Sequence, residues 1–150
     1  MTKNTSKHVD LDNARTEEQT NVMLEIIKNG DDPFSEENLK KYHKLPILEE
    51  AKWWIVTTNQ WPYKNSYKQR LFILRHDAPT LEHIPSEAFR DLLILAQKYA
   101  NQFKIKGGAL CMRFGETSLS GATVTHIHAQ LIQPKKGEVV EFWIGQKTTQ

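Results

Sequence analysis

The chain contains a single cysteine, Cys111, among its 150 residues. One thiol cannot form an intramolecular disulfide, which excludes the disulfide-stabilised domains typical of small secreted proteins. Cys111 lies in an apolar run from Ala109 to Phe114, so we expect a buried and unreactive thiol. This cysteine content is typical of a reducing compartment and predicts a cytoplasmic protein.

Long hydrophobic runs are also absent. The longest ones, such as Trp53 to Val56 and Leu92 to Ala96, fall far short of the roughly 20 apolar residues that span a bilayer. Residues 1–14 have no apolar stretch of the length found in secretory signals. We therefore expect no membrane association and no export, with a disordered segment over residues 1–14 and a single domain over residues 15–150.

The chain has no marked excess of charge of either sign. Its 20 basic and 18 acidic residues give a net charge of +2, and the lysines and arginines form no continuous stripe. Proteins that bind nucleic acid usually carry such a stripe or patch. The composition therefore excludes nucleic acid as the expected partner.

The pattern of apolar residues predicts both helices and strands. Helical spacing covers residues 16–28, where Gly30 would end the helix, and residues 86–103, where Ser86 would cap the start and Gly107-Gly108 would follow the end. Residues 31–46 have no sustained period and predict a connector with one helical turn at most. The predicted strands are 53–58, 68–75, 109–114, 126–133 and 139–144.

This order of elements favours an α+β fold. We expect a mostly antiparallel sheet of about five strands, with one long helix covering a face and a further helix near the N-terminus. The segments 53–58 and 68–75 are joined by turn-forming residues, so they should pair directly.

The most informative segment runs from Thr125 to Leu131. His126, His128 and Gln130 alternate with apolar residues, so an extended strand would place the three polar side chains on one face. Three polar side chains are costly to bury without partners, which favours a functional site over a purely structural one. One face of this strand should carry chemistry and the other should belong to the core.

A segment of small residues precedes this strand. Gly121, Ala122 and Thr123 allow backbone amides to approach a ligand closely, and consecutive amides in a turn can bind an anion. The combination with two histidines indicates histidine chemistry on a phosphate group.

These residues resemble the histidine triad superfamily, whose signature is His-x-His-x-His or His-x-His-x-Gln on a strand. The resemblance covers Trp53 to Ile144 in the order of that family. Besides the histidine strand, three segments carry it: Thr58-Asn59-Gln60-Trp61-Pro62-Tyr63, Ile73-Leu74-Arg75-His76 and Gly121-Ala122-Thr123-Val124.

The resemblance implies nucleotidyl transfer or hydrolysis at the α-phosphate of a nucleotide, with His128 as the nucleophile. A neutral imidazole is available for this attack, and a covalent phosphoramidate would divide one displacement into two. By the same resemblance His126 orients the site, and Asn59 binds the ribose. The hydroxyl of Thr123 and the amides near Gly121 and Ala122 would hold phosphate oxygens.

Gln130 bears on which branch of the superfamily the chain resembles. A glutamine can donate a hydrogen bond to phosphate but cannot supply a proton, so it suits leaving groups that need no acid. In the superfamily this variant is typical of transferases and dinucleoside polyphosphate phosphorylases. The expected substrate is therefore a dinucleoside polyphosphate or a similar nucleotide, with phosphate or water as the acceptor.

Two departures from the family pattern concern ligands. Several relatives have a zinc-binding Cys-x-x-Cys where this chain has Asp32-Pro33-Phe34-Ser35, so we expect no structural zinc and no required cofactor. Gly115 replaces a phosphate-binding asparagine, and Arg113 on the same strand could substitute for it, although a surface or interface arginine is the equal alternative.

Two alternatives to the enzyme remain open at this point. The same fold could bind or sense a nucleotide with little turnover. The two histidines could ligate a metal ion, although the further glutamate and histidine of known sites of that kind are missing. Association is a separate expectation: an edge strand and aromatic residues such as Phe142 and Trp143 favour a homodimer, as is common among small relatives.

Overall fold

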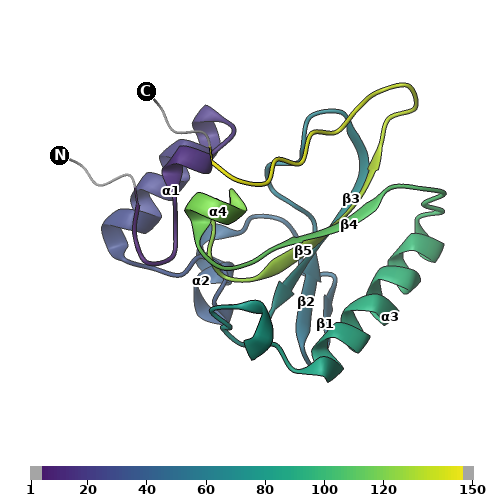
Figure 1. The fold of residues 1–150 in the computed structure, drawn as a ribbon, viewed down its shortest axis with the longest axis horizontal. Helices are drawn as coiled ribbons and strands as arrows, with labels where there is room; N and C mark the ends of the chain where they lie inside the picture. Colours follow the sequence, from purple (N-terminus) through teal and green to yellow (C-terminus); the bar gives the residue numbers. More distant parts are fainter. Residues whose placement is uncertain (1–4, 147–150) are drawn as a thin grey trace.

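The computed structural model describes residues 5–146, and its architecture is a five-stranded antiparallel sheet with helices on both faces. The strands are β1 (Glu49–Glu50), β2 (Trp54–Thr57), β3 (Ser66–Leu74), β4 (Ala109–Arg113) and β5 (His128–Pro134), in the order β1-β2-β3-β5-β4 (Figure 1). The predicted α+β fold with a mostly antiparallel sheet is confirmed. No helix within residues 5–146 is long and apolar enough to cross a membrane.

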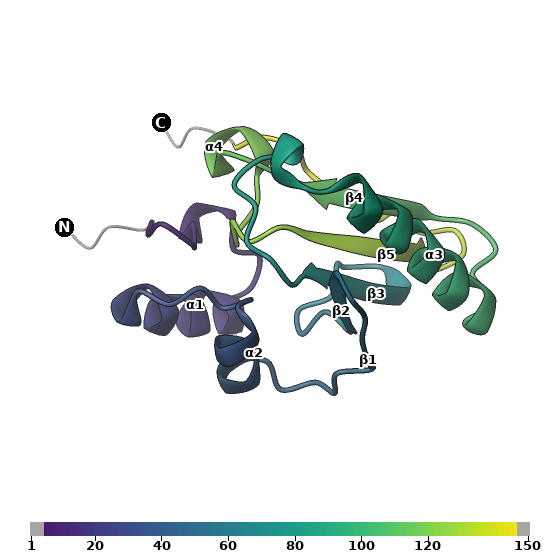
Figure 2. The same cartoon turned by 90° about the horizontal axis from the view of Figure 1, so that it is seen from below.

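The helix α3 (Ser86–Gln102) covers one face of the sheet, and α1 (Glu17–Asn29) and α2 (Glu36–Tyr42) lie on the other side near one end (Figure 2). The larger core lies under α3, where fully buried Trp54, Phe72 and Ala129 meet the apolar face of the helix. This face also includes Ile127 and Leu131, as the alternation around the histidines predicts. The opposite face of β5 is therefore left for polar residues.

Local sequence signals explain the two helices near the N-terminus. Thr16 caps α1 because its side chain accepts a hydrogen bond from the Gln19 amide, and Gly30 ends the helix in the left-handed conformation with φ of 70°. Ser35 caps α2 in the same way, with acidic residues in the first turn and lysines in the last. The sequence predicted α1, whereas it predicted no more than one turn where α2 forms.

The start and end of α3 differ from the prediction. Pro85 is the N-cap and Ser86 is the first helical residue, without a capping hydrogen bond from its side chain. The helix ends at Gln102, before Gly107-Gly108, because the chain turns at Lys104, whose φ is +52°. A proline before the first turn needs no N–H donor, which makes this start acceptable.

The predicted strand over residues 139–144 is wrong. This segment is irregular, and Val139 and Ile144 are 72% and 81% exposed. The β5 strand is paired on both sides, with β3 and β4, so it offers no free edge to this β-forming segment. The strand of two residues, β1, and the short helix α4 (Thr117–Ser120) were not predicted.

The sequence predicted disorder over residues 1–14. Residues 1–4 lie outside the described part of the chain, and residues 5–14 are ordered. Val9 is fully buried and forms an isolated antiparallel bridge with Val124, and a short 3-10 helix follows at Leu11–Asn13. A buried valine gains the hydrophobic free energy that a disordered one lacks. We therefore propose that the single domain includes residues 5–14.

Cys111 is half-buried on β4, where burial raises the pKa of its thiol. It pairs across the strands with Gln130. The raised pKa agrees with the expected low reactivity, although the side chain is less covered than the sequence predicted.

Candidate active site

His128 is the first residue of β5 and lies between Ile73 of β3 and Arg113 of β4 in the sheet register. Its Nδ1 donates a hydrogen bond of 2.8 Å to the backbone carbonyl of His126. That bond places the ring proton on Nδ1 and leaves the Nε2 lone pair without a partner within residues 5–146. A free imidazole lone pair is the form that attacks phosphorus.

Burial lowers the pKa of His128 to about 4, and the nearby charge of His126 adds to this effect. Phe34 contributes to the apolar surroundings, with its ring edge-on to His128 at 5.0 Å between centroids. The imidazole is therefore neutral at physiological pH, because its charged form is disfavoured by desolvation.

His126 lies two residues before the first residue of β5 and is 2% exposed, so it is sealed from solvent. Its Nδ1 is 2.7 Å from a carboxylate oxygen of Asp32, and its Nε2 faces the carbonyl oxygen of Leu74. Both partners are acceptors, so both ring nitrogens carry protons and the ring is an imidazolium.

The pKa values of this pair follow the same arrangement. Desolvation disfavours the charged form of His126, but the hydrogen bond and charge of Asp32 outweigh it and raise the pKa of His126. Desolvation is the largest single influence on the Asp32 carboxylate and opposes its charge, but the hydrogen bond and charge of His126 and the hydrogen bond from the Phe34 amide together lower the pKa of Asp32. The two histidines therefore differ in charge although one residue separates them.

Asp32 and Ser35 are the residues that the resemblance matches to the zinc-binding cysteines of several relatives. Asp32 is paired with His126, and the Ser35 hydroxyl both caps α2 and donates to the Asp32 carbonyl. Within residues 5–146, no three side chains of the types His, Cys, Asp and Glu come close enough together to hold a metal ion. These residues do not fit a structural zinc, and the expected absence of any cofactor stays a prediction.

Gln130 is 3% exposed and lies in a network of polar side chains. Its Oε1 accepts hydrogen bonds from Asn59 and Gln69, and its Nε2 lies 3.4 Å from the hydroxyl of Tyr63. The side-chain oxygen of Asn59 accepts a hydrogen bond from the amide of Trp61. Asn59 thus supports Gln130 and the turn, whereas the sequence predicted a contact with ribose.

The polar groups of the small-residue loop form hydrogen bonds within the protein. The Gly121 amide donates to Thr117, the Ala122 amide to Ser120, and the Thr123 hydroxyl to the carbonyl of Asn13. In this structure the N-terminal segment covers the loop, so these contacts give no support to its predicted role in holding phosphate.

Arg113 lies beside His128, and its charge is among the influences that lower the pKa of His128. Its guanidinium donates to the Tyr63 hydroxyl at 2.8 Å and to the Trp143 carbonyl, and stacks over Phe142 at 3.6 Å. Arg113 thus lies next to His128, and its suggested role in holding phosphate stays a prediction. The sequence analysis missed Arg15, because only the fold brings the N-terminal segment to Tyr63.

Comparison with known proteins gives a consistent result for the fold. No protein-family profile and no curated protein sequence matches this chain. The histidine triad nucleotide-binding protein of Candida albicans superposes with a TM-score of 0.56 at 20% identity, over 75% of this chain and 80% of that one. The chain has the histidine triad fold.

Further structures with this fold agree. A histidine triad family hydrolase of Legionella pneumophila superposes with a TM-score of 0.52 at 20% identity, over 64% of this chain and 87% of that one. A zinc-bound histidine triad family protein of Mycobacterium smegmatis gives a TM-score of 0.54 at 17% identity, over 69% and 76%. The resemblance read from the histidine motif is thereby confirmed for the fold.

Proposed function

We propose that this protein is a nucleotidyl transferase or hydrolase that acts through a nucleotide covalently bound to His128. One observation carries the proposal. The His128 ring is neutral, its Nδ1 donates to a backbone carbonyl, and the lone pair of its Nε2 has no hydrogen-bond partner within residues 5–146. The similarity to a histidine triad hydrolase and to a histidine triad nucleotide-binding protein supports the same class of substrate. A dinucleoside polyphosphate is the proposed substrate.

The reaction has two displacements. The Nε2 lone pair forms a bond to the α-phosphorus, the bond from phosphorus to its bridging oxygen breaks, and the leaving group departs with that electron pair. Water or inorganic phosphate then attacks the same phosphorus, and the electron pair of the P–N bond returns to His128. The attacking oxygen releases its proton to solvent.

Two backbone and side-chain contacts assist these steps. The carbonyl of His126 accepts the Nδ1 proton throughout, so it stabilises the positive charge that grows on the ring during attack. The amide of Gln130, held by Asn59, supplies a fixed dipole next to the nucleophile. Neither group transfers a proton, which suits a leaving group that is stable as an anion.

Intact mass measurement tests the proposal. The protein is mixed with diadenosine tetraphosphate at neutral to alkaline pH, since a phosphoramidate is lost in acid. We expect an adenylate adduct on the wild type and none on His128→Asn. Absence of both adduct and turnover on the wild type, with nucleotide binding retained, would instead favour a nucleotide-binding module, which the covered small-residue loop makes the second candidate.

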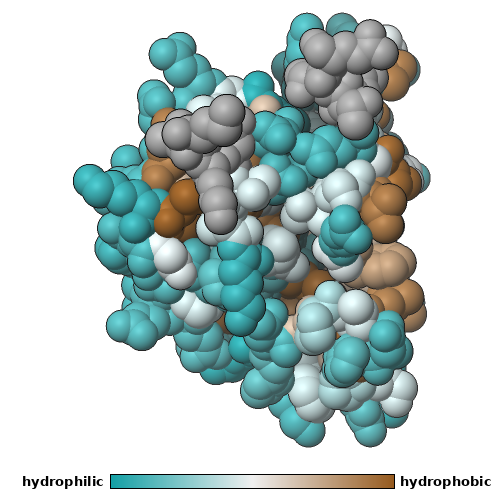
Figure 3. Space-filling model, turned by 60° about the vertical axis from the view of Figure 1, so that its left-hand side comes forward, coloured by the Kyte–Doolittle hydropathy of each residue, from teal (hydrophilic) through white to brown (hydrophobic). Residues whose placement is uncertain are grey.

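We also propose that the protein is a cytoplasmic homodimer. The strand β4 is an edge of the sheet, and Leu110 and Phe114 at this edge are 37% and 48% exposed. Figure 3 shows apolar side chains gathered along one border of a largely hydrophilic face. Sedimentation should give twice the 17.4 kDa of one chain, and Leu110→Lys should give the monomer.

A further inference from the structure

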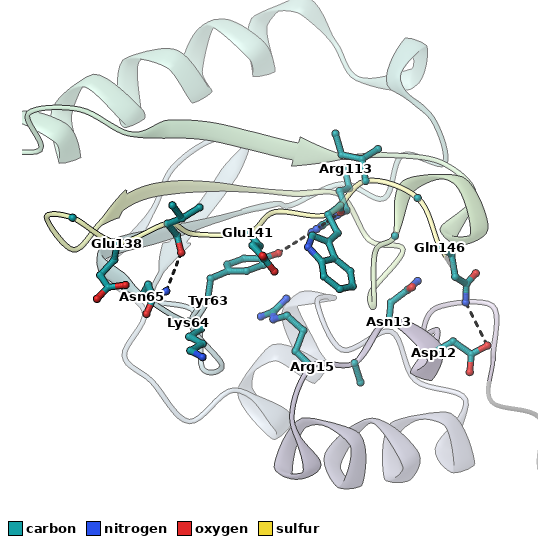
Figure 4. A pocket seen from close by; sticks show the side chains of 17 residues that line it. Asp12, Asn13, Arg15, Tyr63, Lys64, Asn65, Arg113, Glu138, Glu141 and Gln146 are labelled. Atoms are coloured by element: carbon teal, nitrogen blue, oxygen red, sulfur yellow. Dashed lines mark hydrogen bonds between the residues drawn. The ribbon is translucent and has the colours of Figure 1, made fainter. Parts of the chain in front are cut away.

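Two arginines meet at one tyrosine beside His128. The guanidinium of Arg15 lies 3.9 Å from the centre of the Tyr63 ring, and that of Arg113 donates to the Tyr63 hydroxyl. Figure 4 shows Arg15 reaching toward Tyr63 from the N-terminal segment, with Arg113 coming from β4. Tyr63 is 4% exposed, so the platform between the two cations is fixed by burial.

This pair of cations has no anionic partner in residues 5–146. Every ion pair in that range involves other residues, and the carboxylates of Glu138 and Glu141, which line the same cavity, form none with either arginine. Desolvation lowers the pKa of Arg15, and the charge of Arg113 adds to this lowering. Two like charges held together without a counter-ion form a site that favours an anion.

Open hydrogen-bond donors point to the same conclusion. Arg113 donates three hydrogen bonds, to Tyr63 and twice to the Trp143 carbonyl, so its orientation is fixed. Arg15 donates to the carbonyl of Trp61, and a hydrogen bond with Tyr63 also contributes to its pKa, which still leaves several of its N–H groups available. A guanidinium with open donors matches the oxygens of a phosphate group well.

The cavity next to these arginines is large enough for more than one phosphate. Its volume is about 1380 Å³, and its wall joins the N-terminal segment, the β2–β3 loop, the end of β4 and residues 137–146. The nucleophile lies close by, since Arg113 is the cross-strand neighbour of His128 and the charge of Arg15 also lowers the pKa of His128.

We propose that Arg15 and Arg113 form a leaving-group site that selects substrates with a polyphosphate chain beyond the α-phosphate. This inference rests on the proposed function and names its substrate class. When His128 bonds to the α-phosphorus, the bridging oxygen leaves with the bond electrons on a terminal polyphosphate. The two arginines bind that polyphosphate and stabilise the charge that develops on it.

Calorimetric titration with inorganic tripolyphosphate tests the site without any turnover. We expect binding to the wild type and a loss of affinity of about tenfold or more in Arg15→Gln, because a charge-assisted contact is removed. Arg90→Gln, an exposed arginine of α3, is the matched control and should bind like the wild type. Equal binding by Arg15→Gln, or no binding by the wild type at millimolar concentration, overturns the proposal.

Arg15→Lys separates the effect of the positive charge from a structural effect, since Arg15 also contacts Tyr63 and Trp61. It keeps the charge, so it should bind tripolyphosphate more tightly than Arg15→Gln at equal thermal stability. If Lys and Gln weaken binding equally, the contribution of Arg15 is structural and the proposal fails.

Turnover gives the second readout. Arg15→Gln should lower kcat/KM for diadenosine tetraphosphate by about tenfold or more, and leave the 4-nitrophenyl ester of adenosine monophosphate, whose leaving group is stable as an anion and carries no phosphate, unchanged. An equal loss on both substrates contradicts the selection of polyphosphate. Failure of the proposed function looks different: no substrate turns over, while tripolyphosphate still distinguishes Arg15→Gln from Arg90→Gln.

Discussion

His126 and His128 are separated by one residue, and their surroundings make them chemically opposite. His126 is sealed between the Asp32 carboxylate and the Leu74 carbonyl and carries a positive charge. His128 faces one carbonyl and an aromatic ring, and is neutral. The contrast shows that acceptors around a ring decide its protonation: two acceptors require an imidazolium, whereas one leaves a lone pair free.

The charged histidine also acts on the neutral one. The positive charge on His126 lowers the pKa of His128, after the larger effect of burial. The buried pair therefore helps to keep the proposed nucleophile unprotonated. This arrangement assigns a structural and electrostatic role to the first histidine and a chemical role to the second.

The largest expected effect is a loss of turnover on replacement of His128, the neutral histidine. His128→Asn should reduce turnover of diadenosine tetraphosphate by about a thousandfold or more, because it removes the nitrogen lone pair that attacks phosphorus in the proposed mechanism. Its unfolding free energy should stay close to that of the wild type, since the His128 side chain forms one hydrogen bond to the backbone. Steady-state rates and urea unfolding of the same preparation give both values.

Asp32→Ala tests whether the buried pair of Asp32 and the charged His126 stabilises the fold. It leaves His126 buried without its counter-ion, and we expect a loss of about 3 kcal/mol in the free energy of unfolding. Asp32→Asn should lose less, because an amide can donate to Nδ1 of a neutral His126. Asp91→Ala on α3, which forms no ion pair within residues 5–146, is the control. A loss as small as that of the control would refute the buried pair.

The same pair predicts how stability varies with pH. The pKa of His126 is raised, so its stabilising contribution is complete below the unfolded value of about 6.5 and is lost as the pH rises through the folded value. The pKa of Asp32 is lowered, so its contribution is complete above about 3.9 and is lost on acidification. The free energy of unfolding, measured with urea, should decline between about pH 6.5 and pH 9. Asp32→Ala should abolish this decline.

Titration of His128 sharpens the comparison further. Its pKa of about 4 predicts a ring that stays neutral at pH 5, whereas His126 is protonated there. Carbon-detected nuclear magnetic resonance of the two rings measures this without any substrate. Phe34→Ala should raise the pKa of His128 by admitting water, and an unchanged value would mean that Phe34 does not contribute to desolvation.

Asn59→Ala has the smallest expected effect. The amide of Asn59 joins Gln130 to the Trp61 turn, so we expect a loss of about 1 kcal/mol in the free energy of unfolding. A contact with ribose predicts something different, namely that the preference for ribose over 2′-deoxyribose substrates disappears in this variant. Kinetics with both sugars distinguish the two roles.

Much of the fold was predictable because local signals agree with it. The cap at Thr16, the stop at Gly30 and the alternation around His128 all describe properties of neighbouring residues. The prediction for residues 139–144 failed for the opposite reason: these residues favour a strand, but they pair with no strand of the sheet, and β5 already has a partner on both sides. Secondary structure that depends on a distant partner is not visible in the local pattern.

The candidate site divides in the same way. The alternating spacing was sufficient to find His126, His128 and Gln130, since they lie within five consecutive residues at and just before the start of β5. The pairing of Asp32 with His126 and the approach of Arg15 to Tyr63 join segments far apart in the chain. A single sequence contains no periodic signal for such contacts, so only the assembled fold reveals them.

The interleaving of both chain ends with the small-residue loop has a consequence for folding. Asn13 binds the carbonyl of Ala122, and the left-handed turn at Gly121 leaves a side chain no room, because a Cβ there would lie 2.6 Å from the Gly145 carbonyl. Contacts between such distant positions form slowly, since a long loop must close first. During synthesis on the ribosome, the site would therefore stay incomplete until residues near 145 emerge, and a nascent chain would have no activity.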